Sequence, residues 1–67
     1  MKSLKMKFKC GDIVTCLNDI SCPSLTLLKG TKVKILSLDR IFKTYDIMDV
    51  NDSAKWILDV SEKELTV

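Results

Sequence analysis

Three cysteines, Cys10, Cys16 and Cys22, are the residues of this 67-residue chain best suited to metal or redox chemistry. Five residues separate each cysteine from the next. A structural zinc site requires four ligands, usually Cys or His with steps of the C-x₂₋₄-C type. The chain has no histidine, so carboxylates or a second chain would have to complete the ligand set. We therefore expect none of the three cysteines to bind a metal.

The same cysteines are poorly suited to redox or nucleophilic chemistry. An odd number of cysteines argues against a closed disulfide framework. We find no secretory signal in the basic N-terminus and expect a cytoplasmic location, where disulfides are rare. Without histidine, a Cys–His mechanism is excluded. Cys16 shares a predicted strand face with Val14, so we expect it to be buried as a small apolar residue.

Other catalytic patterns are also missing from the sequence. There is no Gly-rich phosphate-binding loop, and the segment "DVNDS" (49–53) lacks the ligand pattern of a calcium loop. The aspartates that could act as acid and base stand at predicted turns or outward strand positions: Asp12, Asp46, Asp49, Asp52 and Asp59. We therefore expect a protein that is not an enzyme and that uses no cofactor and no small-molecule substrate.

Apolar and polar residues alternate through most of the chain, which is the pattern of β-strands. Strands are predicted over 12–17, 31–36, 44–50, 54–60 and 65–67, with a long loop over 18–30 and a connection over 37–43. Ser61 and Glu64 match the capping-box pattern, but only one helical turn fits there, so a 3₁₀ turn is predicted. This arrangement favours an all-β, small five-stranded barrel with a long first loop and a 3₁₀ turn before the last strand, typical of SH3-like barrels.

The alternation also assigns the inward-facing side chains. We predict a core of Val14, Cys16, Val33, Ile35, Tyr45, Ile47, Trp56, Leu58 and Val60, closed at one end by Leu25, Leu27 and Leu28. Residues 1–9 alternate apolar residues with lysines and are read as a basic, extended N-terminal segment. Residues 10–67 are then the barrel domain.

Four segments resemble the small SH3-like proteins of bacteriophages and bacterial mobile elements. These segments are "FKCGDIVTCLND", "LTLLKGTKVKIL", "YDIMDVND" and "WILDVSEKEL", which together span residues 7 to 65. The family shows an F-K-x-GD-x-V start, an LT-x-GK-x-Y-x-V strand and a Y-x-V-x-ND hairpin. Val33 stands near the position where the family often carries an aromatic residue. The resemblance, which extends distantly to the KOW motif, implies an SH3-like fold and a phage-type accessory role; most members have no assigned activity.

Lysines form the first candidate binding surface. Residues 1–9 contain four lysines and no acid, whereas residues 39–67 contain seven acids and four bases. Lysines on outward faces could contact nucleic-acid phosphates, and the candidates are Lys5, Lys7, Lys9, Lys32 and Lys34. The alternative is that a lysine-rich edge strand resists edge-to-edge aggregation. The sequence leaves both interpretations open.

The segment "DRIFK" (39–43) provides the second candidate surface. It places two large apolar residues in a connection between strands, flanked by cations, and the candidate protein-binding residues are Arg40, Ile41, Phe42 and Lys43. Exposed apolar groups rimmed by charge suggest a protein contact. The alternative is that Ile41 folds back over the open end of the barrel.

These observations favour a non-enzymatic binding module. We expect an accessory protein that binds and modulates a larger host or viral protein, in the host cytoplasm if it is viral. A nucleic-acid-binding module using the lysine face is the alternative, and a structural part of a larger particle is a third possibility. No apolar run approaches the ~20 residues of a membrane span, so no membrane partner is expected.

Overall fold

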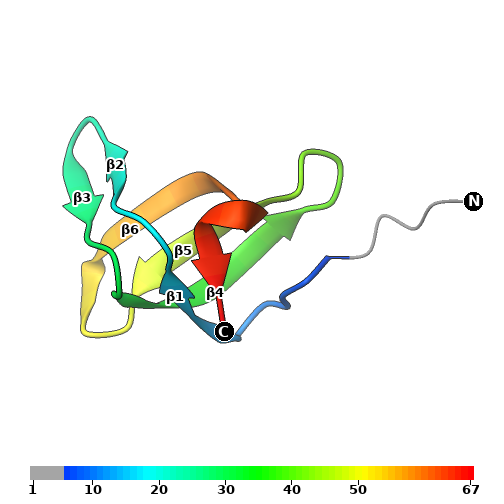
Figure 1. Cartoon of the computed structure of the whole chain (residues 1–67), viewed down its shortest axis with the longest axis horizontal. Coiled ribbons are helices and arrows are strands. Elements are labelled where there is room, and N and C mark those ends of the chain that lie inside the picture. The colour runs from blue at the N-terminus through cyan, green and yellow to red at the C-terminus, as the bar shows by residue number, and fades with distance from the viewer. Residues whose placement is uncertain (1–5) are drawn as a thin grey trace, which may run out of the picture.

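The alternating segments form antiparallel strands in the computed structural model, which describes residues 6–67 (Figure 1). The elements are β1 (Ile13–Cys16), β2 (Ile20–Cys22), β3 (Leu25–Leu27), β4 (Lys32–Asp39), β5 (Thr44–Asp49), β6 (Asp52–Ser61), the 3₁₀ turn η1 (Glu62–Glu64) and β7 (Leu65–Thr66). No α-helix occurs in this part of the chain, and the all-β prediction is confirmed. Lys5 lies outside the described residues.

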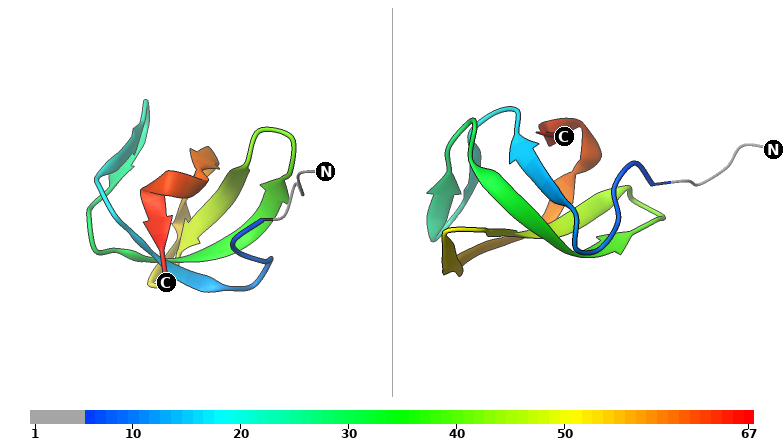
Figure 2. Two further views of the ribbon diagram at one scale, coloured as in Figure 1. Left: turned by 45° about the vertical axis from the view of Figure 1, so that its right-hand side comes forward. Right: turned by 90° about the horizontal axis from the view of Figure 1, so that it is seen from below.

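Five of the strands form one antiparallel sheet in the order β6-β5-β4-β1-β7. The sheet is not closed into the expected barrel, because β6 and β7 stand at its two edges. The remaining strands, β2 and β3, pair only with each other and form a separate hairpin. The left view of Figure 2 shows this hairpin projecting away from the five-stranded sheet.

The core lies against the inner face of the strongly bent sheet. Its buried residues are Phe8, Val14, Cys16, Leu27, Val33, Ile35, Tyr45, Ile47, Ile57, Val60 and Leu65. The inward positions predicted on β1, β4 and β5 are therefore all confirmed. In these strands the residues between the inward ones carry polar or charged side chains, so burial of the apolar set determines the face.

On β6, the prediction that Trp56 and Leu58 point inward is wrong. Both side chains are about half exposed, and Ile57 is buried instead. The reason is a β-bulge: Ile57 pairs with Ile47 and Val60 pairs with Tyr45, which leaves two residues on β6 opposite one on β5.

The extra residue reverses the alternation between Ile57 and Val60. Asp59, in the bulge, has a left-handed backbone (φ 58°). Its N–H donates a hydrogen bond of 3.1 Å to Asp46 Oδ1.

The segment predicted as a loop over 18–30 contains the β2–β3 hairpin, turned at Pro23 and Ser24. Lys29 N–H donates to Asp19 Oδ1 across 2.8 Å, which closes the base of the hairpin. Leu27 enters the core as predicted, but Leu28 is 63% exposed and does not plug it. Leu27 and Leu28 are adjacent on an extended chain, so they cannot face the same side.

The N-terminal segment bends at Lys7 and Phe8 and forms no strand over residues 6–10. This bend turns Phe8 into the core, so the core includes a residue of the segment assigned to 1–9. A tight turn follows, in which Gly11 adopts a φ of 91° that glycine accepts without steric cost.

The 3₁₀ turn predicted before the last strand is confirmed as η1. The capping box does not form, because the Ser61 side chain makes no capping hydrogen bond. Glu64 instead accepts a hydrogen bond from Asn18 Nδ2 at 3.0 Å. After the turn, Leu65 is buried and pairs with Cys16, so β7 extends the sheet beside β1.

Candidate functional site

The Arg40–Lys43 turn joins β4 to β5 and presents two apolar side chains to solvent. Ile41 is 79% exposed and Phe42 is 76% exposed. Neither side chain covers the core, so the alternative in which Ile41 folds back is wrong. Figure 1 shows this turn and the β2–β3 hairpin at opposite ends of the view.

Hydrogen bonds fix the backbone of this turn. Asp39 Oδ1 accepts the N–H of Ile41 at 2.9 Å and the N–H of Phe42 at 3.2 Å. This is the Asx-turn geometry for which aspartate is favoured. At the other end, Lys43 has a left-handed backbone (φ 53°), and its carbonyl accepts the N–H of Glu62. The turn thus holds its exposed apolar pair on an ordered backbone.

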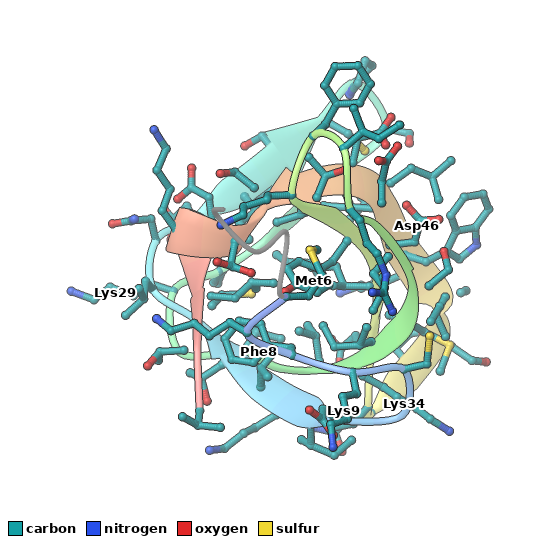
Figure 3. All side chains as sticks on the ribbon, turned by 90° about the vertical axis from the view of Figure 1, so that its right-hand side faces the viewer. Met6, Phe8, Lys9, Lys29, Lys34 and Asp46 are labelled. Carbon is teal, nitrogen blue, oxygen red and sulfur yellow. The ribbon has the colours of Figure 1, made fainter. Side chains whose placement is uncertain are left out.

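The lysines of the predicted nucleic-acid surface fall into two groups. Lys7 and Lys9 lie on the bent N-terminal segment, where their backbone N–H groups donate to Glu62 and Asp12. Lys32 and Lys34 lie on the outer face of β4, and Lys32 Nζ donates to Thr15 Oγ1 at 3.2 Å. Figure 3 shows Met6 and Phe8 over the interior, while Lys29 and Lys34 project outward.

Trp56 extends the outer-face group in a way that the sequence did not predict. Lys34 pairs with Met48 on β5, and Met48 pairs with Trp56 on β6. Directly paired residues share a face of the sheet, so a row of outward side chains runs from Ile13 through Lys34 and Met48 to Trp56. Lys32 lies on the same face of β4 as Lys34. The exposed indole of Trp56 therefore shares one surface with these two lysines.

A groove separates the β2–β3 hairpin from β6, and we call it the β6 groove. It consists of two adjoining depressions, of about 350 and 370 Å³, that share Cys22, Ile57 and Leu58. Its further lining comes from the hairpin and from the C-terminal part of the chain: Ile20, Ser21, Pro23, Ser24, Leu25, Ala54, Trp56, Asp59, Val60, Ser61 and Glu64. The sequence analysis did not identify this surface.

A partly buried hydroxyl–carboxylate pair joins both ends of the described chain. Tyr45 Oη donates to Glu62 Oε2 and accepts the N–H of Phe8. Burial, followed by the hydrogen bond to Glu62, raises the pKa of Tyr45. Hydrogen bonds from Tyr45 and from the Lys7 N–H lower the pKa of Glu62. Both shifts favour a Tyr45 hydroxyl that donates to an ionised Glu62 carboxylate.

The three cysteines occupy different environments and all are free thiols. Cys16 is buried, and this burial raises its pKa. Cys22 lies 3.6 Å from Ser24 Oγ, and hydrogen bonding to Ser24 lowers the pKa of the Cys22 thiol. Within residues 6–67, no three Cys, Asp or Glu side chains are grouped so as to hold a metal ion.

Comparison with known proteins gives no relative: no family model, curated protein or solved structure matches the chain. Over residues 6–67, no helix has the length and apolar character needed to cross a membrane.

Proposed function

We propose that this chain is a non-enzymatic binding module that docks on a larger protein through the Arg40–Lys43 turn. The observation that carries the proposal is the exposure of Phe42 on a backbone fixed by Asp39. Aromatic side chains are enriched among the residues that dominate binding energy at interfaces. A rigid backbone reduces the entropy that binding must remove, so this turn has the properties of a preformed anchor.

The resemblance to phage SH3-like proteins extends this proposal to an accessory role. Two features support an SH3-like relationship: the strongly bent antiparallel sheet, and the 3₁₀ turn that precedes β7. On this proposal, the partner is a larger host or viral protein, and binding modulates that protein without a chemical step.

A nuclease-controlled pull-down with matched variants tests the proposal. Phe42→Ala removes the anchor, and Leu28→Ala serves as the control because Leu28 is also exposed, at 63%. We expect a protein partner that survives nuclease treatment, is lost with Phe42→Ala and is retained with Leu28→Ala. Both variants should melt close to the parent protein. Equal retention by both variants, or a largely unfolded Phe42→Ala, would contradict the proposal.

Nucleic-acid binding is the second candidate, and the exposed row containing Lys34 and Trp56 favours it. Base stacking on aromatic side chains combined with basic residues is the usual mode of binding single strands. Trp56 is the only tryptophan of the chain, so quenching of its fluorescence by an oligonucleotide reports contact directly.

The test compares the lysines of β4 with a lysine elsewhere. If Lys32 and Lys34 contact phosphates, their joint change to Gln should lower the salt slope of single-strand binding by about 1.4, since each lost contact contributes about 0.7. Lys63→Gln, in η1, is the control. The same comparison with Lys7 and Lys9 changed to Gln tests the N-terminal group. Absence of quenching at low salt would exclude this function.

A further inference from the structure

A depression of about 440 Å³ adjoins the Arg40–Lys43 turn at the end of the core, and we call it the basic depression. Its lining residues are Met6, Phe8, Lys9, Cys10, Leu38 and Arg40. Arg40 belongs both to the turn and to this lining. The basic depression is therefore continuous with the proposed docking surface.

The floor of the basic depression is apolar. Met6 and Leu38 are partly buried against the core, and Phe8 belongs to the core itself. Figure 3 faces this end of the molecule and shows Met6 and Phe8 over the interior. The turn leaves the floor uncovered, since Ile41 and Phe42 are both largely exposed. An apolar side chain of another molecule can therefore pack on this floor.

The rim of the basic depression is positively charged. Among the described residues that line it, Lys9 and Arg40 are cations and none is an acid. The planar guanidinium of an arginine donates two parallel hydrogen bonds to a carboxylate, and a lysine adds a second point of positive charge. The rim is therefore complementary to an acidic group.

Two carboxylates near the N-terminal segment are bound to other partners. Asp12 Oδ2 accepts the N–H of Lys9 at 2.9 Å. Glu62 accepts the Tyr45 hydroxyl and the N–H of Lys7, and the charges of Lys43 and Lys7 help to lower its pKa. These acids reduce the net charge of the region, but neither lines the basic depression.

Asp39 lies on the other face of the sheet. Leu38 pairs with the buried Tyr45, whereas Asp39 pairs with Thr44, so alternation directs the Leu38 and Asp39 side chains to opposite faces. Asp39 lines a second depression together with Phe42, Thr44 and Asp59. The turn thus has a basic side and an acidic side, and an acidic group of a partner is favoured on the basic one.

The floor favours a peptide over a nucleic acid. Binding of single strands uses exposed aromatic rings on which bases stack, but Phe8, the aromatic residue of this lining, is only 2% exposed. A peptide brings apolar and acidic side chains together, which matches an apolar floor with a basic rim.

We propose that the basic depression binds an acidic segment of the partner protein. In this segment a large apolar side chain packs on Met6 and Leu38, and neighbouring carboxylates bind Lys9 and Arg40. The inference rests on the proposed function, because it places the basic depression in the same interface as Phe42.

Two cysteines provide reporters with opposite surroundings. Cys10 is exposed in the basic depression, whereas Cys22 lines the β6 groove, whose lining contains Asp59 and Glu64 and no basic residue. Iodoacetate and iodoacetamide are similar in size and differ in charge. The ratio of their alkylation rates, measured by peptide mass spectrometry, removes the intrinsic reactivity of each thiol. This ratio should be higher at Cys10 than at Cys22.

Variants of the rim test the source of this preference. Lys9→Gln and Arg40→Gln should each lower the iodoacetate preference of Cys10 by about two- to fivefold, the range expected for one exposed charge pair. Lys29→Gln is the control, because Lys29 lies at the base of the β2–β3 hairpin, at the opposite end of Figure 1 from the turn. An unchanged ratio in both rim variants would overturn the inference.

A peptide tests the proposed occupant. The probe is a capped five-residue peptide of glycine, glutamate, leucine, glutamate and glycine. It should protect Cys10 from iodoacetamide saturably and leave the rate at Cys22 unchanged. Peptides with both glutamates replaced by glutamine or lysine, or with the leucine replaced by alanine, should protect less. Arg40→Gln should weaken protection by the parent peptide.

The remaining outcomes separate the possible occupants. The inference is overturned if the glutamate peptide leaves Cys10 unprotected or if the lysine peptide protects it equally well. It is also overturned if hexanoate or a single-stranded oligonucleotide protects Cys10 while the peptide does not, because the site would then take a small carboxylate or a nucleic acid.

Lys9→Glu distinguishes this inference from the proposed function, because Lys9 lies outside the turn. In the nuclease-controlled pull-down, Lys9→Glu should reduce capture of the partner that depends on Phe42. Full capture by Lys9→Glu, with loss in Phe42→Ala, would overturn the inference and leave the docking turn standing. Protection of Cys10 by the peptide, with no partner that depends on Phe42, would support the peptide site and contradict only the proposed docking turn.

Discussion

The hydroxyl of Tyr45 donates a 2.6 Å hydrogen bond to the carboxylate of Glu62, and this pair fastens the N-terminal segment to η1. The same hydroxyl accepts the N–H of Phe8 at 3.1 Å, and the carboxylate accepts the N–H of Lys7 at 2.9 Å. The rings of Phe8 and Tyr45 also pack with their centroids 5.5 Å apart. One tyrosine and one glutamate therefore position the segment that completes the core.

Tyr45→Phe should destabilise the protein by about 1–2 kcal/mol. The ring remains, but the buried N–H of Phe8 loses its acceptor, and leaving a buried donor unsatisfied costs about 1–3 kcal/mol. Urea denaturation measures the change. Thr26→Val is the control, because it removes an exposed hydroxyl that bonds to Ser21, and it should change stability by less than about 0.5 kcal/mol. Equal stability of Tyr45→Phe and the parent would contradict the proposed role of the hydroxyl.

Acid should weaken the protein through Glu62. The folded pKa of Glu62 lies below its ordinary value of 4.5, mainly because of the Tyr45 hydrogen bond. A depressed folded pKa stabilises the protein at pH values above the unfolded pKa, and this stabilisation is lost as the pH falls through the folded pKa. The urea concentration at the unfolding midpoint should therefore decrease as the pH is lowered below 4.5. The decrease should be less steep in Glu62→Gln. Parallel pH profiles for the two proteins would show that Glu62 does not contribute.

Lys43→Gly should stabilise the protein by up to about 1 kcal/mol. A left-handed backbone costs a non-glycine residue about 1–2 kcal/mol, and part of the gain is offset by the greater freedom of glycine in the unfolded chain. Thermal melting measures the shift. Lys63→Gly provides the control, since Lys63 is an exposed residue of η1 without a positive φ. The Lys63→Gly protein should be less stable than the parent. A lower melting temperature for Lys43→Gly would contradict the expectation.

Iodoacetamide should distinguish the cysteines in the folded protein. Cys10 is exposed and Cys22 is partly exposed, so both should be alkylated readily. Cys16 should resist, because it is only 1% exposed and burial raises its pKa, which reduces the reactive thiolate. Peptide mass spectrometry gives the order of reaction, and all three should react in denaturant. Native Cys16 reacting as fast as Cys10 would disprove its burial.

Strand alternation predicted the inner faces of β1, β4 and β5 because their sequences alternate apolar with polar residues. It failed on β6, where Trp56, Ile57 and Leu58 are consecutive apolar residues, and either face could be inward by composition alone. The choice is made by the bulge at Asp59, which depends on pairing with β5. No local pattern in the sequence specifies that pairing.

The Arg40–Lys43 turn and the β6 groove also differ in how far the sequence alone predicts them. The exposure of Phe42 could be predicted because it depends on a short connection between two strands. The β6 groove could not, because its walls come from the β2–β3 hairpin and from β6, which are distant in the sequence. The hairpin itself had a readable signal, since "ISC" and "LTL" each alternate on either side of Pro23 and Ser24.

The bulge in β6 has a consequence for the evolution of this chain. Losing one residue between Ile57 and Val60 would leave both of them facing inward, now two positions apart in a regular strand. The loss of one codon at this point therefore preserves the core, although it shifts the numbering of every residue that follows. A homologue that lacks the bulge should consequently be aligned with a one-residue gap at positions 58–59. An ungapped alignment would match the surface tryptophan of one protein with a core residue of another.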